Sequence, residues 1–270
     1  MSLCLNELSR YLQQYLSVDK IKDYCPNGIQ VEGRENVKRI IGGVTACQAL
    51  IDAAVERNAC AILVHHGYFW KGEAQPITGI KKKRIKQLLL NDISLLAYHL
   101  PVDVHPECGN NAQLAQCLDI EITGSLEIGN PRSVGLVGKL QHARSAQQFA
   151  AHVSDRLGRK CEFVGEPDQL IHSIGFCTGA AQGMIDLAVS QNLDAYLSGE
   201  ISEPTVHVAR ETGLVYFAAG HHATERAGIQ ALGQHLAEKF DIEFEFIDIC
   251  LLYTSPSPRD QRGSRMPSSA

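Results

Sequence analysis

The sequence predicts an α/β fold made of two similar α/β units. Short apolar runs of strand type alternate with stretches of helical periodicity along most of the 270 residues, a pattern typical of sheets covered by helices. The second half repeats the element order of the first, and residues 51–61 (IDAAVERNACA) match residues 185–195 (IDLAVSQNLDA). We therefore expect an internal duplication, with one unit over residues 1–124 and the other over 125–250.

The first unit opens with an amphipathic helix, because Leu5, Leu8, Leu12, Tyr15 and Leu16 lie at helical spacing. The same periodicity predicts three further helices, over residues 48–58, 81–91 and 110–118. Apolar runs bounded by turn residues predict strands over residues 29–32, 39–44, 61–65 and 93–98, with a loop over 67–79.

The second unit follows the same order. Ser145 is a good N-cap for a helix that reaches residue 157. Strands are expected near residues 161–164, 171–177, 195–198, 215–219 and 244–249, and helices over 182–191, 203–212 and 221–239. Residues 251–270 are rich in Ser, Pro and Arg and lack periodicity, so we expect a disordered or non-native tail there.

Composition excludes several classes of protein. The formal net charge is −5, and the basic run Lys81-Lys82-Lys83-Arg84 on a predicted helix is typical of a solvated face, so nucleic-acid binding is not indicated. There is no apolar run long enough to span a membrane and no signal peptide. Nine scattered cysteines without a C-x-x-C pair predict reduced thiols. We therefore expect a cytoplasmic protein.

Three polar clusters follow predicted strands, where open α/β sheets place their ligands. The first is His65-His66-Gly67, at a strand end where both imidazoles can reach one cavity. The other two each carry a histidine followed four residues later by a carboxylate, namely His99 with Asp103 and His221 with Glu225. His221 and Glu225 share a helix face. Pro101 interrupts the other pair, and we expect a loop there.

Imidazole and carboxylate ligands together suit zinc, iron, manganese or nickel, and suit calcium or magnesium poorly. Five or more such groups exceed the needs of a single catalytic ion, but they fit two divalent ions about 3.5–4 Å apart, bridged by a carboxylate and a water. Any one of these histidines alone is better explained as a helix cap or core-edge hydrogen bonder. Their repeated placement at strand ends favours a metal centre.

These three clusters resemble the signature of the NIF-three-like family, the GTP cyclohydrolase I type 2 homologues, and the similarity runs from the first helix to about Ile249. The resemblance implies two similar three-layer α/β/α domains with a dinuclear metal centre between them, and a toroidal homohexamer. It also implies the ligands and gives Glu225 the role of bridge. The implied ligands are His65, His66, Asp103, His221 and Glu225.

Several other residues are candidates for the same site. His99 and His222 are the nearest remaining imidazoles, and each could orient a ligand or shuttle a proton. The aromatic run Tyr68-Phe69-Trp70 could stack a base, form a packed lid or make a subunit contact. Glu200 takes the repeat-equivalent place of His66, and could face the cavity or be a remnant of duplication. Glycines at 42–43 and 179–183 are weak candidates for phosphate contacts.

Two functions remain open. The first is a dinuclear metal-dependent hydrolase acting on a nucleotide or related heterocycle, and the resemblance implies attack on the purine ring of GTP, at the carbon between the imidazole nitrogens. The second is a non-catalytic ring-shaped protein that binds metal or a partner, for storage, insertion or assembly. An open coordination position facing a cavity would favour the hydrolase.

Overall fold

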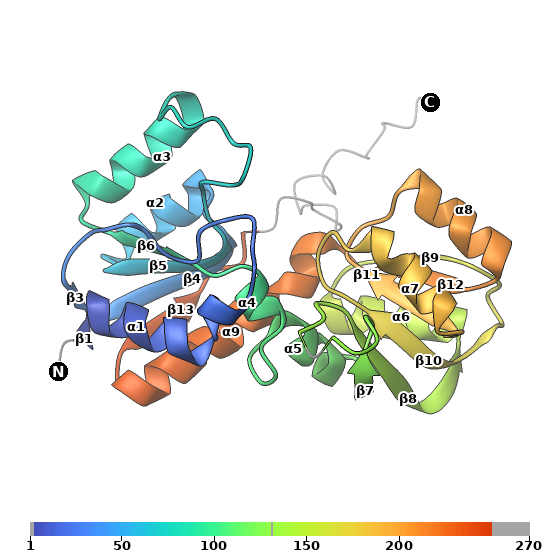
Figure 1. Cartoon of the computed structure of the whole chain (residues 1–270). Coiled ribbons are helices and arrows are strands. Elements are labelled where there is room, and N and C mark those ends of the chain that lie inside the picture. Colours follow the sequence, from blue (N-terminus) through green and yellow to red (C-terminus); the bar gives the residue numbers. More distant parts are fainter. Residues whose placement is uncertain (1–2, 131, 250–270) are drawn as a thin grey trace, which may run out of the picture.

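The structure, a computed structural model, describes residues 3–130 and 132–249. Two α/β units lie side by side, each built on one sheet (Figure 1). A short antiparallel pair, β1 (Leu3–Cys4) with β3 (Asn36–Val37), stands apart from both sheets. The predicted α/β fold is confirmed. The predicted tail over 251–270 lies outside the described residues.

The first unit contains a five-stranded sheet. Its strands are β2 (Gly28–Val31), β4 (Arg39–Thr45), β5 (Ala61–His66), β6 (Ser94–Ala97) and β13 (Glu243–Phe246). They lie in the order β13-β4-β5-β6-β2, and all are parallel except β2, which runs antiparallel to β6. β5 and β6 are covered on both faces, which explains why they appear in the sequence as continuous apolar runs.

Helices cover both faces of this sheet. They are α1 (Leu5–Tyr15), α2 (Gln48–Glu56), α3 (Gly79–Leu90) and α9 (His221–Phe240). α2 and α3 pack against one face through Leu50 and Leu88, and α1 and α9 pack against the other through Leu8 and Leu232. Two short helical segments, η1 (Val18–Lys20) and α4 (Leu100–Asp103), lie between this sheet and the second unit (Figure 1). α4 follows β6 and leads the chain into the second unit.

The second unit has a six-stranded sheet. Its strands are β7 (Ile120–Ser125), β8 (Leu136–Ser145), β9 (Glu162–Val164), β10 (Leu170–Phe176), β11 (Ala195–Ser198) and β12 (Val215–Ala218). They lie in the order β7-β8-β10-β11-β12-β9. β10, β11 and β12 are parallel to one another, and the three outer strands pair antiparallel with their neighbours.

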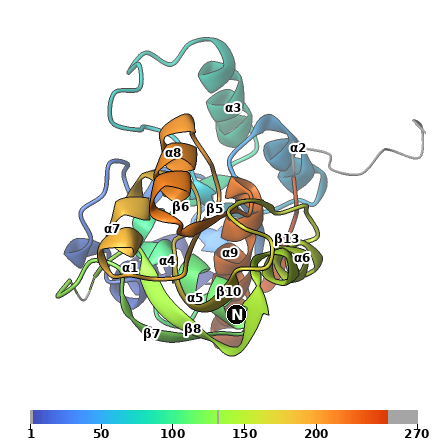
Figure 2. The same ribbon diagram turned by 90° about the vertical axis from the view of Figure 1, so that its right-hand side faces the viewer.

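Helices also sandwich the second sheet (Figures 1 and 2). They are α5 (Asn110–Cys117), α6 (Ala146–Leu157), α7 (Ile185–Ser190), which follows the single turn η2 (Gln182–Met184), and α8 (Glu203–Thr212). α5 and α6 pack on one face through Leu114 and Phe149. α7 and α8 pack on the other through Ala188 and Ala209.

The sheets divide the chain differently from the predicted ranges 1–124 and 125–250. α9 starts directly after β12 of the second unit, crosses beneath the first unit and delivers β13 to the edge of β4 (Figure 1). β7, at residues 120–125, belongs to the second sheet. The ring of Phe244 on β13 lies against Gly42 and Gly233, which leave space for it. Packing of this aromatic strand therefore places the chain's end in the first unit.

Two local expectations need correction. The segment after His99 forms the short helix α4 and not a loop, because Pro101 lies in the first turn, where a missing N–H costs nothing. The β7–β8 hairpin was not predicted, since most side chains of β7 are exposed and give no apolar alternation. By contrast, the predicted N-cap at Ser145 is confirmed by a capping box with Gln148.

Two features of the structure bear on the predicted absence of a membrane span and of disulfides. Among the described residues, no helix combines the length and apolar character needed to cross a bilayer. The cysteines in the described part of the chain are free of disulfides.

Gly42 and Gly43 lie inside β4, where side chains from Phe244 and Leu50 fill the space beside them, so their role is packing and not phosphate binding.

The docking of β13 can be tested with Gly233→Ala. An added Cβ would lie 2.0 Å from the Phe244 ring, so the ring and strand must shift. We expect a loss of about 1–3 kcal/mol in the free energy of unfolding, measured by urea denaturation. The control is Gly124→Ala, where nothing lies within 4 Å of the new Cβ. An equal effect of both variants would contradict this account of β13.

Candidate metal centre

A cavity of about 520 Å³ lies between the two units. The first unit contributes its floor and an aromatic wall, the second unit contributes the small and apolar opposite wall, and α9 adds two polar side chains. The lining residues used below are Tyr24, His66, Trp70, His99, Asp103, Thr178, His221 and Glu225. Segments far apart in the sequence therefore meet at one polar cavity, as expected for the carboxyl ends of parallel strands.

The end of β5 directs two adjacent imidazoles to the cavity. His65 is fully buried, and its Nδ1–H donates to the carbonyl of Tyr98 over 3.1 Å. This hydrogen bond leaves Nε2 directed toward the carboxylates of Asp103 and Glu225, behind the cavity surface. The His66 ring lies 4.6 Å from that of His65, and its Nδ1 is 3.2 Å from the Thr45 hydroxyl. Two neighbours on one strand thus reach the same site, as predicted.

α4 presents Asp103 from the first unit. This carboxylate is buried, and its Oδ1 accepts hydrogen bonds from the Asn110 amide at 2.8 Å and the Thr178 hydroxyl at 3.3 Å. Asn110 in turn accepts from the backbone N–H of Gly228 on α9. Asp103 is therefore fixed by two residues of the second unit, one on α5 and one just after β10, and indirectly by α9. Sequence patterns gave no signal for Asn110 or Thr178.

The first turns of α9 supply Glu225 and His221, which face the same side as their spacing predicted. Glu225 Oε1 lies 3.6 Å from His65 Nε2, and Oε2 lies 3.3 Å from His66 Nε2 and 3.2 Å from His221 Nε2. Asp103 Oδ1 lies 3.5 Å from His65 Nε2. The structure thus brings together all five predicted ligands, with Glu225 in the middle.

Two residues explain how Glu225 and His221 are held. Gly179 has a positive φ of +68°, and a Cβ there would lie 2.1 Å from Glu225 Oε1, so only glycine leaves room for the carboxylate. Nδ1–H of His221 donates to Glu200 Oε1 over 2.7 Å. Glu200 therefore contacts one of the predicted ligands from behind, although it is not among the residues that line the cavity.

The ionisation of the site follows from burial and close carboxylates. Burial alone would lower the pKa of His65, but Asp103 and Glu225 outweigh it and raise the pKa to about 9. The Glu225 carboxylate, whose Oε2 lies 3.2 Å from His221 Nε2, raises the pKa of His221 to about 9, against the effect of burial. Burial, together with the charge of His65, lowers the pKa of His66 to about 3.

The two carboxylates of the site differ. Burial would raise the pKa of Glu225, but the charge of His65 and the close imidazole of His221 hold it below its usual range. Burial raises the pKa of Asp103, and the nearby charge of Glu225 adds to this, against the lowering effect of His65. Without an ion, this site therefore holds protons on His65 and His221 near neutral pH.

The donor set fits metal ions. His65 Nε2 and Glu225 Oε2 are buried and have no hydrogen-bond partner, a costly arrangement that a bound cation would relieve. Ligand atoms about 2.1 Å from one tetrahedral zinc lie about 3.4 Å apart, close to the 3.2–3.6 Å separations observed. Ligand atoms within 4.8 Å of one another occur in four groups among the described residues: His65-Asp103-Glu225, His66-His221-Glu225, His65-His66-His99 and Asp23-Cys25-His99. The first two meet at Glu225, and the last two share His99.

The two remaining predicted residues are placed differently. His99 lines the cavity, and its Nδ1–H donates to Asp23 Oδ1 over 3.0 Å. Burial would raise the pKa of Asp23, but hydrogen bonds from His99 and Asn27 lower it to about 2. His222 does not line the cavity, because its helix position turns it outward, where Nε2–H donates to Asp248 over 2.6 Å. Grouping His222 with the site is therefore corrected.

Aromatic side chains form one wall of the cavity. Trp70 meets His99 edge-on at 5.0 Å, and Tyr24 lies 5.8 Å from Trp70. Tyr68, in contrast, is buried with its hydroxyl bonded to the Ala46 carbonyl. Of the predicted aromatic run, Trp70 therefore faces the cavity and Tyr68 is packed in the core.

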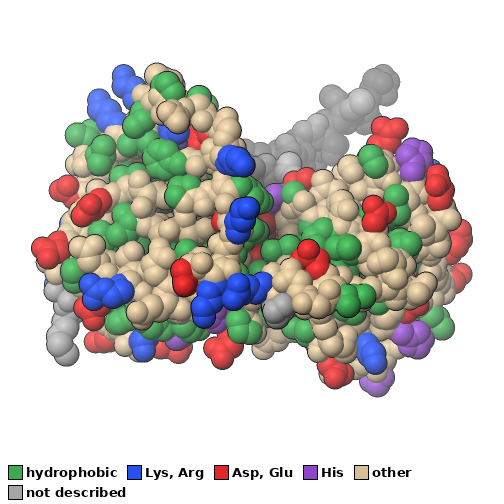
Figure 3. All heavy atoms as spheres, in the orientation of Figure 1, with side chains coloured by type: hydrophobic (Ala, Val, Ile, Leu, Met, Phe, Trp, Pro, Cys, Tyr) green, Lys and Arg blue, Asp and Glu red, His purple; other side chains and the backbone are tan. Residues whose placement is uncertain are grey.

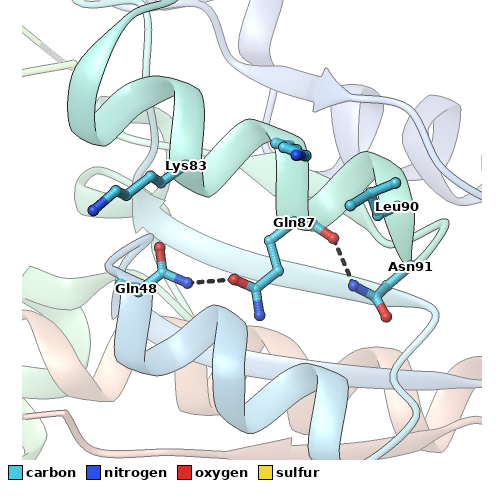
Figure 4. A pocket seen from close by; sticks show the side chains of 6 residues that line it. Gln48, Lys83, Gln87, Leu90 and Asn91 are labelled. Atoms are coloured by element: carbon cyan, nitrogen blue, oxygen red, sulfur yellow. Dashed lines mark hydrogen bonds between the residues drawn. The ribbon is translucent and has the colours of Figure 1, made fainter.

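A second, open groove lies between α2 and α3 (Figure 4). It is lined by Gln48, Lys83, Lys86, Gln87, Leu90 and Asn91, and the amides of Gln48 and Gln87 bond to each other across it over 2.6 Å. The groove has no imidazole or carboxylate among these residues. These residues offer no set of metal ligands like the one at the cavity between the units.

Comparison with known proteins gives consistent matches. The model of one family, Duf34/NIF3 (NGG1p interacting factor 3), matches residues 3–252. A Pseudomonas aeruginosa protein named GTP cyclohydrolase 1 type 2 homolog is 57% identical over 248 residues, which cover 92% of this chain and 98% of that protein. An Escherichia coli K12 protein of the same name is 48% identical over 244 residues, which cover 90% and 97% respectively.

Two solved structures are also similar. Protein ybgI, of unknown function, has a TM-score of 0.88 at 47% identity, with 92% of this chain and 99% of that chain covered. A protein from Thermus thermophilus has a TM-score of 0.81 at 30% identity, with 95% of this chain and 100% of that chain covered. These matches extend over both units.

Metal binding should release protons. His65 and His221, with pKa values of about 9, hold protons at pH 7 that an ion must displace. We expect affinity for Zn²⁺ to rise with pH up to about 9, by up to about tenfold per pH unit for each proton displaced. Calorimetric titration in buffers of different ionisation enthalpy counts those protons. Binding without proton release and without pH dependence would refute these charge states.

The space beside Glu225 can be tested with Gly179→Ala. We expect a stability loss of about 1–2 kcal/mol from the positive φ, and in addition a clear loss of bound zinc, because the new Cβ would displace the carboxylate. Gly158→Ala is the matched control, since Gly158 has a φ of +65° and open space around it. Denaturation with elemental analysis measures both effects. Equal zinc content in the two variants would contradict the crowding at Glu225.

Proposed function

The chain belongs to the Duf34/NIF3 family, as its resemblance predicted, and we propose that it is a dinuclear metal-dependent hydrolase acting on a nucleotide or related heterocycle. One observation carries the proposal. Glu225 directs one oxygen toward His65 and the other toward His66 and His221, at a buried point where His65 Nε2 and Glu225 Oε2 lack partners. A shared carboxylate between two sets of ligands is the arrangement that two adjacent ions require.

Each of the two proposed ions has its own pair of ligands in addition to Glu225. We propose that His65 and Asp103 hold one divalent ion and that His66 and His221 hold the other, with Glu225 as the bridge. Two such ions supply Lewis acidity and an acidified water for hydrolysis. Zinc, iron, manganese and nickel all suit these ligands. The proposed duplication is supported by the matching places of two pairs, since His99 and Asp103 follow β6 and His221 and Glu225 follow β12.

The other cavity residues would bind and orient the substrate. Trp70 and Tyr24 offer aromatic surface to a heterocyclic ring. His99 lies at the aromatic wall beside the imidazoles of His65 and His66, and Asp103 and Glu225 make the floor anionic. Lys and Arg side chains gather on one face where the units meet, which favours an anionic substrate (Figure 3). His222 is left out of the reaction because it faces away.

The relatives' name suggests the first substrate to test, which is GTP. We propose hydrolytic attack at the purine carbon between the two imidazole nitrogens, with oxidised and ring-opened purines as further candidates. Assembly into a toroidal homohexamer also remains part of the proposal. Light scattering of the purified chain measures it.

Turnover of GTP and of oxidised or ring-opened purines by metal-loaded protein tests the function. We expect His65→Ala and Glu225→Ala to lose at least about 100-fold in kcat, because each removes a ligand. Asp248→Asn, outside the cavity, should keep wild-type rates. Tightly bound metal with equal rates in all proteins, or with no turnover by any of them, would favour the alternative of a metal-binding or partner-binding ring protein.

A further inference from the structure

A buried carboxylate lies directly behind His99. The side chain of Asp23 is 3% exposed and that of His99 is 8% exposed, and the two are joined by the hydrogen bond from Nδ1–H to Oδ1. Asp23 comes from the turn before β2, far from the predicted clusters, and nothing in the sequence pattern singles it out. Its neighbours show what it does.

Every group around this carboxylate is a hydrogen-bond donor. Besides His99, Oδ1 accepts from the backbone N–H of Tyr24 at 2.7 Å. Oδ2 accepts from the backbone N–H of Leu100 at 2.9 Å and from the side-chain amide of Asn27 at 3.0 Å. A carboxylate accepts hydrogen bonds at both oxygens and therefore satisfies all of these donors. An amide in its place would turn an NH₂ group toward donors on one side.

The same turn also fixes the backbone of His99. The Asn27 side chain donates to Asp23 and accepts from the backbone N–H of His99 over 2.7 Å. Trp70 and Tyr24 meet the His99 ring edge-on at 5.0 and 5.1 Å. The backbone of His99, the edge of its ring and its Nδ1 are therefore each held by a neighbouring group, so the ring is fixed in one orientation.

This arrangement decides which nitrogen of His99 faces the cavity. Because Nδ1 carries the proton that Asp23 accepts, Nε2 is left with its lone pair. The His99 ring lies 4.9 Å from the ring of His65 and 5.7 Å from that of His66, and the three form one candidate ligand group.

We propose that Asp23, braced by Asn27, is a positioning residue that fixes His99 in the Nδ1–H tautomer and so presents the Nε2 lone pair to the metal centre. The inference rests on the proposed function in treating that centre as metal-binding. The turn over residues 23–27 thus sets the tautomer and orientation of the His99 imidazole, which comes from the segment before α4.

Zinc affinity, measured by competition with a chromophoric chelator, tests the proposal. Asp23→Asn keeps size and shape but turns an NH₂ group toward His99 or toward Leu100 and Asn27. We expect it to weaken one zinc site by about 10- to 100-fold, the range for residues that orient metal ligands. Asp248→Asn, which disturbs the matched aspartate–histidine pair outside the cavity, should leave zinc affinity unchanged.

A double-mutant cycle separates positioning from general structure. If Asp23 acts through His99, then Asp23→Asn should cost nothing further in a His99→Ala background. Additive losses in zinc affinity, or wild-type affinity of Asp23→Asn, would overturn the proposal. Thermal unfolding in the presence of a chelator shows whether each variant is folded.

A second measurement tests the tautomer of His99 directly, in protein without metal. In metal-free protein with ¹⁵N-labelled histidine, the wild-type His99 signal should show a protonated Nδ1 and an unprotonated Nε2. Asp23→Asn should move the proton toward Nε2, while Asp248→Asn should not. An unchanged tautomer would overturn the proposal. Failure of the wild type to bind any zinc would instead refute the proposed metal centre and leave this result standing.

Discussion

The buried carboxylate of Glu225 is the group on which the arrangement of the two units depends. It sits at the start of α9, between imidazoles from β5 and from its own helix, and only a few per cent of it is exposed. An unpaired charge in such a place costs several kcal/mol. The two units must therefore meet so that His65, His66 and His221 surround it. Gly179 then has to be a glycine, because no other residue leaves room for Oε1.

One rule connects the four imidazoles of the cavity. In each ring Nδ1 is engaged by a group behind it, and Nε2 is left toward the centre. The partners are the Tyr98 carbonyl for His65, the Thr45 hydroxyl for His66, Asp23 for His99 and Glu200 for His221. Contacts of this kind fix the orientation of each ring before any ligand arrives, and this preorganisation lowers the cost of binding an ion. The chemistry of the cavity therefore depends as much on these supports as on the predicted ligands.

Sequence reasoning reached the parts of the molecule that local patterns specify. Buried strands such as β5 have continuous apolar runs, and the HH and H-x-x-x-D/E clusters named the five residues that meet in the cavity. Asp23 and Asn110 were missed, because their role comes from tertiary contacts that leave no spacing in the chain. His222 was grouped with the site because it follows His221, but neighbours on a helix point about 100° apart. The β7–β8 hairpin was missed because its exposed strand lacks an apolar pattern.

The path of α9 has a consequence for how the protein is made. The N-terminal sheet lacks its edge strand β13 and the helix that covers Ile40 and Leu63 until the last described residues have been synthesised. A nascent chain emerging from the ribosome therefore carries an incomplete first unit, with an open strand edge and an uncovered apolar face. The C-terminal sheet, by contrast, has all its strands once residue 218 is out. Folding during translation thus runs against the usual order, with the earlier-synthesised half waiting for the end of the chain.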